Sequence, residues 1–309
     1  MNRIIIGCKS QDNIIHFLKE NFYIVEPYIY YKNGKIIKNF DIYFNFDGTL
    51  ADTKMMQLHN IQSIGHRRME KYEQMVVASK LDITVPDTYK FVLDNNVGSR
   101  HDTLYKIIDE IEDSEKFIIK AENGARGVGQ ALVTKNEMYK LVDLCYQTNI
   151  STDDLYQMFD IGAKDTFRND GEKEFFRNIV KEAEFIIQRK VEMTDEWRFM
   201  YFYKEDPIII KRDVSNWQAN TSITGKGDYE KYDMDNEDHY KMQEIADRLC
   251  CKLNTPFLSM DFYKDTTGNI GLFEYQMQMG YAKVPKNELV KKTINSISKY
   301  IKDCTPINI

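Results

Sequence analysis

Long apolar runs are absent from this chain of 309 residues. A helix that spans a bilayer needs ~20 consecutive apolar residues, and no stretch approaches that length, so the sequence predicts no membrane partner. The apolar run that begins the chain, residues 1–7, is too short for a secretory signal and favours a first β-strand.

Cysteine and histidine are few, and the chain has no excess of positive charge. The five cysteines show no metal-ligand or redox spacing, and an odd number without a secretory signal favours reduced thiols and a cytoplasmic location. A net charge of −6 argues against nonspecific nucleic-acid binding, which needs a basic surface. With only five histidines, no Ser–His–Asp or Cys–His arrangement stands out. These absences exclude several common classes and leave a site to be found among charged side chains.

The composition is otherwise that of a globular protein, 42% hydrophobic and 29% charged. The length allows two or three domains. We expect an N-terminal α/β domain over 1–85, a central lid domain over 86–187 and a C-terminal lobe over 188–309. Turn signals and periodicity predict strands at 4–6, 24–30, 41–46, 117–120, 130–133, 185–188, 197–203 and 207–211, and helices at 13–18, 67–81, 137–145, 174–183 and 237–253. Residues 148–172 are polar and irregular.

The most informative segment is a predicted hairpin, with strands at 258–263 and 270–276. The five residues between Lys264 and Ile270 have the composition of a tight loop. We expect Asp265 to pair with Ile270 across this loop. That register also pairs Tyr263 with Leu272, Asp261 with Glu274, and Ser259 with Gln276.

The pair formed by Asp261 and Glu274 carries the chemical interest of this hairpin. Directly opposed residues point to the same side of a sheet, and two carboxylates there repel each other unless a cation lies between them. Hard oxygen ligands in small number suit Mg²⁺. The alternative is an exposed hairpin with scattered acids. The opposite face is expected to carry apolar residues that pack: Met260, Phe262, Phe273 and Tyr275.

A Gly-rich loop follows the strand that ends at Lys120. Its three glycines, Gly124, Gly127 and Gly129, fall within six residues, and they allow backbone N–H groups to approach an anion closely. Lys120 and Arg126 can add positive charge toward the same phosphates. The loop is neither a P-loop nor a dinucleotide fingerprint, since it lies between two strands and its glycines are in another order. A flexible hairpin turn is the alternative.

Two further charged segments follow in order, at 185–199 and at 210–227. Together with the Gly-rich loop and the hairpin, they resemble the ATP-grasp superfamily over approximately residues 65–285. One sequence motif is similar to that of the RimK-type glutamate-ligase branch: Lys211-Arg212, then Trp217-Gln218-Ala219-Asn220 and Gly225. The resemblance implies an α/β (α+β) protein with the ATP-grasp fold: an N-terminal α/β domain, a small lid domain and a C-terminal antiparallel-sheet lobe.

The resemblance also assigns a nucleotide site. It implies that Lys120 and the loop with its three glycines hold the ATP phosphates, with Lys71 as an earlier lysine that reaches them. The segment from Gln188 through Arg189 to Val191 would bind adenine, and Glu196 the ribose hydroxyls. Gln188 stands where the family frequently has Glu. The backbone contacts to adenine do not depend on this difference, whereas a contact from the Glu side chain is not expected here.

For catalysis, the resemblance implies that Arg198 and Arg212, with Asn220 downstream, neutralise charge on the γ-phosphoryl group and the acyl phosphate. It implies that Asp261, Glu274 and the residue two positions on hold Mg²⁺, in two ions. That last residue is Gln276 where the family has Asn. Glutamine keeps the amide oxygen but adds a methylene, so one metal position is expected to shift.

The expected reaction is phosphorylation of a carboxylate by ATP, followed by attack of an amine on the acyl phosphate. The products are ADP and an amide or peptide bond, with an amino acid, a peptide or a small carboxylate as substrate and a homo-oligomer as a possible assembly. Phosphoryl transfer depends on positioning and charge neutralisation, and a closing lid protects an acyl phosphate from water. Two alternatives stay open: an ATP-grasp kinase that phosphorylates a hydroxyl, and a non-catalytic ATP-binding scaffold.

Overall fold

The structure is a computed structural model of the 309-residue chain. It describes residues 5–7, 22–33, 35–45, 54–56, 58, 60–65, 69–92, 105, 108–110, 112–113, 115–122, 130–145, 184–214, 227–277 and 284–304.

The N-terminal part contains a parallel sheet in the order β2-β1-β5-β6. Its strands are short: Ile5–Gly7 (β1), Tyr23–Val25 (β2), Ile42–Phe44 (β5) and Ser63–Ile64 (β6). All three residues of β5 are buried, as expected for a parallel strand covered on both faces. The helix expected at 13–18 lies outside the described residues.

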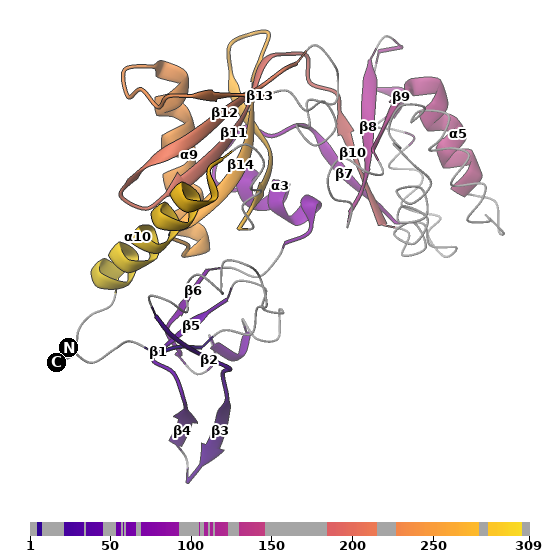
Figure 1. The fold of residues 1–309 in the computed structure, drawn as a ribbon. Coiled ribbons are helices and arrows are strands. Elements are labelled where there is room, and N and C mark those ends of the chain that lie inside the picture. The colour runs from indigo at the N-terminus through magenta and orange to yellow at the C-terminus, as the bar shows by residue number, and fades with distance from the viewer. Residues whose placement is uncertain are drawn as a thin grey trace.

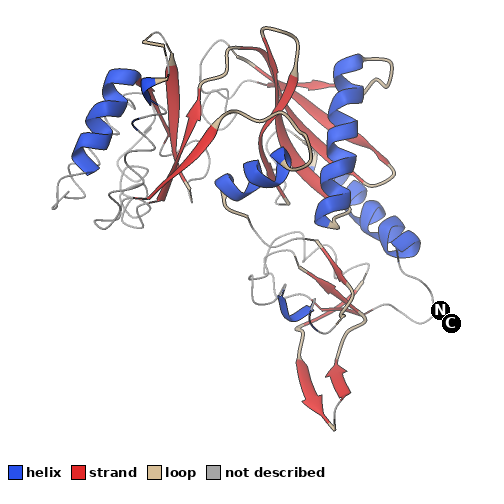
Figure 2. Ribbon diagram, turned by 180° about the vertical axis from the view of Figure 1, so that it is seen from behind, coloured by secondary structure: helices blue, strands red, loops and turns tan. Residues whose placement is uncertain are grey.

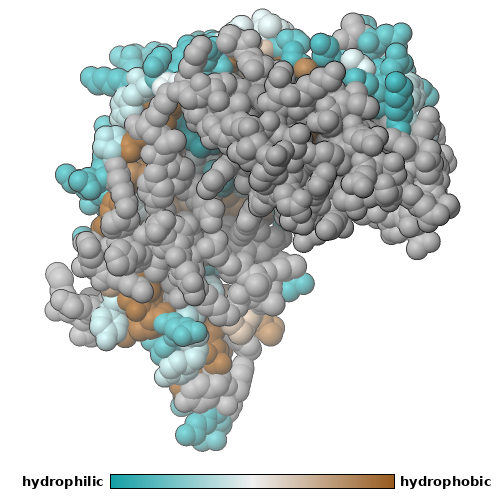
Figure 3. All heavy atoms as spheres, turned by 45° about the vertical axis from the view of Figure 1, so that its right-hand side comes forward, coloured by the Kyte–Doolittle hydropathy of each residue, from teal (hydrophilic) through white to brown (hydrophobic). Residues whose placement is uncertain are grey.

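The strand expected at 24–30 is wrong, because two strands share that segment. Pro27 lies between β2 and Ile29–Lys32 (β3), which pairs instead with Lys35–Lys38 (β4). Since proline lacks a backbone N–H, it interrupts a sheet ladder. The β3–β4 hairpin projects from the N-terminal sheet (Figure 1), and its tip is hydrophilic (Figure 3).

The central part is an antiparallel sheet in the order β7-β10-β8-β9. Its strands are Thr88–Val92 (β7), Lys116–Ala121 (β8), Gln130–Thr134 (β9) and Glu184–Arg189 (β10). The helix Lys135–Cys145 (α5) follows β9 directly and lies beside the sheet (Figure 1). The strands predicted at 117–120, 130–133 and 185–188 are confirmed. The predicted 148–172 segment and the helix at 174–183 lie outside the described residues.

The C-terminal part is a second antiparallel sheet, in the order β13-β12-β11-β14-β15. Its strands are Met193–Phe202 (β11), Glu205–Arg212 (β12), Gly227–Glu230 (β13), Phe257–Asp265 (β14) and Ile270–Gln276 (β15). Glu237–Leu253 (α9) and Lys286–Cys304 (α10) lie on opposite sides of this sheet (Figures 1 and 2). Neither β13 nor α10 was expected from the sequence.

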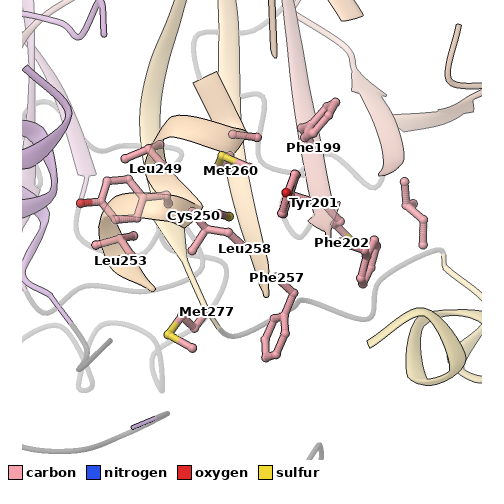
Figure 4. Packing of buried hydrophobic residues seen from close by; sticks show 14 of the residues in the cluster. Phe199, Tyr201, Phe202, Leu249, Cys250, Leu253, Phe257, Leu258, Met260 and Met277 are labelled. Carbon is pink, nitrogen blue, oxygen red and sulfur yellow. The ribbon is translucent and has the colours of Figure 1, made fainter. Parts of the chain in front are cut away.

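Helix α9 covers the apolar face of the C-terminal sheet. Its Leu249 and Cys250 lie beside Leu258 and Met260 of β14 (Figure 4), and all four are buried. The Lys264 ammonium of β14 reaches Asp238 of α9 at 2.8 Å on the same side. The opposite face carries the charged cluster that includes Arg198, Arg212 and Asp261.

A short helix, Lys71–Ser79 (α3), lies between the two antiparallel sheets (Figures 1 and 2). It lies within the helix predicted at 67–81, and an exposed Asp82 with φ of 54° follows it in the turn that ends the helix. No helix in the part of the chain that the structure describes is long and apolar enough to cross a membrane.

Candidate active site

Three neighbouring strands bring a charged cluster together on one face of the C-terminal sheet. The registers pair Glu196 of β11 with Arg212 of β12, and Arg198 of β11 with Asp261 of β14. Because directly paired residues share a face and alternate residues return to it, all four side chains lie on the same side.

Asp261 is the centre of this cluster. Its Oδ1 accepts from Arg198 Nε at 2.9 Å and from Arg212 Nη2 at 3.0 Å, and its Oδ2 accepts from Arg198 Nη2 at 2.9 Å. Arg212 also donates through Nη1 to Glu196, and both of these side chains are buried. The bidentate contact with Arg198 is the geometry that fixes guanidinium and carboxylate most firmly.

Electrostatics follow from this geometry. Burial alone would raise the pKa of Asp261, but Arg198 and Arg212 outweigh it and lower the pKa to about 2. For Glu196, burial raises the pKa against the opposing effect of Arg212. Asp261 is therefore ionised at neutral pH and holds two guanidinium groups in place.

The hairpin register is confirmed at the acidic end and wrong near the loop. Asp261 pairs with Glu274 and Ser259 with Gln276, whereas Lys264 rather than Asp265 pairs with Ile270. The register shifts by one residue between Asp261 and Phe262. A β-bulge explains the difference: it inserts an unpaired residue and re-aims side chains.

The unpaired residue in β15 is Phe273, so its predicted place on the apolar face is wrong. Its ring lies 4.4 Å, centroid to centroid, from the ring of Tyr263, which is on the charged face. Opposite Tyr263 stands Gly271, where a Cβ atom would lie 2.3 Å from that ring. Nothing in the local sequence indicates the bulge, so the pair of rings formed by Tyr263 and Phe273 is a feature of the site that was not predicted.

The central sheet contributes Lys120 and Gln188, which lie on the same face of neighbouring strands. The Lys120 ammonium lies 5.6 Å from the centroid of the Phe273 ring, so this face looks toward the charged face of the C-terminal sheet. Burial lowers the pKa of Lys120, and Glu274 opposes the shift. The Gln188 amide donates to Thr88 Oγ1 at 2.9 Å.

Lys71 approaches the same region from α3. Its ammonium donates to the backbone carbonyl of Glu122 at 2.8 Å and is buried. It is close enough to Lys120 to lower the pKa of that lysine. Glu122 directly precedes the Gly-rich loop, so both lysines lie at the base of that loop.

The remaining predicted residues are placed as follows. Arg189 points to the other face of the central sheet, with Nη1 3.5 Å from Asp87 and Nε 3.8 Å from Glu115. Val191 lies in the connection between β10 and β11 and is partly exposed. The three glycines and Asn220 are outside the described residues: Gly124, Gly127, Gly129 and Asn220.

The residues expected to hold Mg²⁺ fit that ion when a phosphate supplies further oxygens. Among the described residues, no three Asp, Glu, His or Cys side chains gather into a complete metal site. Asp261 and Glu274 are paired on one face, with the Gln276 amide two residues on and paired with Ser259. The Ser259 hydroxyl is buried without a hydrogen-bond partner in the described structure. Mg²⁺ commonly takes one or two carboxylates plus phosphate oxygens and water, which agrees with this donor set.

Comparison with solved structures defines the fold. VanG D-Ala:D-Ser ligase from Enterococcus faecalis is 14% identical, with a TM-score of 0.54 over 97% of this chain and 100% of that chain. D-alanyl-alanine synthetase A from Vibrio cholerae is 13% identical, with a TM-score of 0.53 over 98% of each chain. The chain therefore has the ATP-grasp fold, with a parallel N-terminal sheet and antiparallel central and C-terminal sheets. The sequence itself matches no protein-family model and no curated protein.

Proposed function

We propose that this protein is an ATP- and Mg²⁺-dependent ligase that joins a carboxylate to an amine through an acyl phosphate. One observation carries the proposal: Arg198 and Arg212 bind Asp261, Lys120 faces the same carboxylates of the C-terminal sheet, and Lys71 lies near Lys120. Preorganised cations around a developing negative charge are what phosphoryl transfer requires.

The nucleotide is proposed to bind between the two antiparallel sheets. Lys71 and Lys120, at the base of the Gly-rich loop, are suited to the phosphates. The paired rings of Tyr263 and Phe273, next to Lys120, offer an aromatic surface for adenine. In this proposal the backbone of 188–191 remains the adenine hinge and Glu196 the ribose ligand, so Glu196 would have to exchange its contact with Arg212.

Arg198 and Arg212 are proposed to neutralise the γ-phosphoryl group and the acyl phosphate, with Asn220 beside them. Asp261, Glu274 and Gln276 would hold Mg²⁺, which supplies charge neutralisation at the phosphates when bound. Arg198 and Arg212 also keep Asp261 ionised and correctly oriented before any ligand arrives.

The proposed substrates are an amino acid, a peptide or a small carboxylate together with an amine. The two similar structures are named for D-alanyl-alanine synthesis and D-Ala:D-Ser ligation, which supports amide formation between small amino acids or their relatives. The sequence of residues 211–225 favours the RimK-type glutamate-ligase branch. Acidic and D-amino acids are therefore the first candidates.

Isothermal titration of a non-hydrolysable ATP analogue, first with Mg²⁺ and then with EDTA, tests the nucleotide site. We expect tighter binding with Mg²⁺. Absence of binding under both conditions would refute the proposal. Release of ADP that requires both a carboxylate and an amine then separates a ligase from a kinase, which would transfer phosphate to a hydroxyl without any amine.

A further inference from the structure

Helix α3 is bound at its first turn to the end of strand β8. The Lys71 ammonium donates to the Glu122 carbonyl at 2.8 Å, and the Tyr72 backbone N–H donates to Glu122 Oε1 at 3.1 Å. The N-cap residue, Glu70, makes no capping hydrogen bond with its own side chain. Glu122 therefore satisfies one of the N–H groups that a helix leaves unpaired at its start. Glu122 itself directly follows strand β8 of the central sheet.

One turn later, the same helix is bound to strand β15. Gln74 is buried, and its Oε1 accepts from the backbone N–H of Tyr275 at 3.0 Å. Its Nε2 donates to the Met69 carbonyl at 3.1 Å, which fixes the orientation of the amide. Because β15 is the edge strand of its sheet, Gln74 takes the place of a neighbouring strand for this N–H.

Tyr275 lies between Glu274 and Gln276, the two proposed Mg²⁺ ligands of β15. The β-bulge at Phe273 is only two residues away. A bulge locally disrupts the ladder of hydrogen bonds, so the strand depends on other contacts to keep Glu274 on the charged face. Gln74 supplies such a contact directly at the ligand pair.

We infer that Gln74 and Glu122 are positioning residues. Helix α3 is the rigid element between them: it holds Lys71, which contacts Glu122, at a fixed distance from strand β15, which carries the proposed metal ligands. The inference rests on the proposed function. Within one helix of nine residues, Lys71 is held against the central sheet and Gln74 against the C-terminal sheet. Sites need their groups held within about 0.5 Å of the productive geometry.

The two positioning residues predict different losses. Gln74→Met keeps the length of the side chain but removes the acceptor for Tyr275, so the Mg²⁺ ligands lose their support. Changes in residues that orient metal ligands typically cost ~10–100-fold in metal affinity. The ratio of ATP-analogue affinity in Mg²⁺ to that in EDTA measures the contribution of the metal. We expect this ratio to be at least ~10-fold smaller in Gln74→Met than in wild type, while the affinity in EDTA stays within about twofold of wild type.

Glu122→Ala should weaken nucleotide binding whether or not Mg²⁺ is present. Loss of the carboxylate frees the start of α3 and with it Lys71, so affinity should fall in EDTA as well as in Mg²⁺. Glu122→Gln keeps an oxygen acceptor for the Tyr72 N–H and should restore wild-type affinity. If Glu122→Gln were as weak as Glu122→Ala, positioning through the Tyr72 hydrogen bond would be wrong.

The control variant is Thr293→Val, which removes a buried hydrogen bond to the Leu289 carbonyl in α10, away from the site. It should lower the urea midpoint without changing either affinity. Amide hydrogen exchange over 270–276 gives a readout that needs no nucleotide, and Gln74→Met should accelerate exchange at Tyr275.

The outcomes separate the inference from the proposed function. A wild-type protein that binds no nucleotide refutes both. If wild type binds the nucleotide and Mg²⁺ raises the affinity of Gln74→Met as much as that of wild type, the inference is overturned and the ligase proposal stands. Unchanged amide exchange at Tyr275 in Gln74→Met has the same meaning. Loss of the gain in Gln74→Met but not in Thr293→Val supports it.

Discussion

Replacement of Asp261 by asparagine should affect stability as well as activity. The side chain accepts three hydrogen bonds from two guanidinium groups. A carboxyl group whose pKa falls from ~3.9 in the unfolded chain to about 2 in the folded protein stabilises the fold by ~2–3 kcal/mol at neutral pH. Asparagine also presents an N–H₂ group toward Arg198, where a carboxylate oxygen accepted before. We therefore expect Asp261→Asn to abolish turnover and to lower the free energy of unfolding by ~2–3 kcal/mol.

Glu274→Gln is the matched variant, because the two residues share a proposed metal role but differ in their contacts. Glu274 makes no hydrogen bond or ion pair with another described residue, although it acts electrostatically on Lys120 and Arg198. Its replacement should abolish turnover and cost less than ~1 kcal/mol of stability.

Urea unfolding at several pH values tests this difference. The pKa of Asp261 is depressed in the folded state, so its contribution is present above the unfolded pKa and is lost as the pH falls toward about 2. The gap between wild type and Asp261→Asn should therefore be largest at neutral pH and shrink below pH ~4. If Asp261→Asn were no less stable than Glu274→Gln at neutral pH, the stabilising role of the two arginines would be refuted. Near-normal turnover in either variant would refute the metal assignment.

Three further predictions concern ligand binding. Lys120→Ala should weaken binding of the ATP analogue ~10–100-fold, as expected for loss of a hydrogen bond to a charged group. Unchanged affinity and turnover would contradict the role of Lys120. The control is Lys116→Ala, because Lys116 is exposed at the far end of the same strand. Burial lowers the pKa of Lys120, and bound phosphates should raise it again, so nucleotide binding at alkaline pH should take up protons. In titration calorimetry this uptake appears as a binding enthalpy that depends on the buffer. A wild-type enthalpy independent of the buffer would exclude this coupling. Phe273→Ala should weaken ADP about 3–10-fold by loss of ring stacking but leave inorganic tripolyphosphate unaffected, and equal weakening of both ligands would argue against an adenine surface there.

Local signals in the sequence predicted elements best where caps are strong. Helix α9 is confirmed at its predicted bounds, because Asn236 accepts from the first backbone N–H groups and Asn254 ends the helix in the left-handed conformation. The pairing of Asp261 with Glu274 was predicted from a loop register in which Asp265 pairs with Ile270. Lys264 takes that place, and the one-residue shift at the bulge restores the predicted pairing beyond it. The bulge was not predictable, since nothing in the local sequence marks Phe273 as unpaired and only three-dimensional packing shows which residue has no partner.

The contacts that assemble the site were harder to predict, because they join residues far apart in the chain. Glu122 and Tyr72 are separated by 50 residues, and Gln74 and Tyr275 by 201. Gln74 is an uncharged residue in an ordinary amphipathic helix, so nothing in its local sequence marks it. Lys71 was found only through a family resemblance, and the structure adds the neighbours that hold it.

The charge balance between the sheets argues against the alternative of an exposed hairpin with scattered acids. Asp261 is largely buried between two arginines, and the buried Glu196 shares one of them. Lys120 faces this group with its pKa lowered by burial, which means that its charged form costs stability at neutral pH. Replacing buried ion pairs by apolar side chains is often neutral or stabilising, so packing alone does not account for such a cluster. Perturbed groups of both signs that face each other across two sheets are typical of a site for a charged ligand.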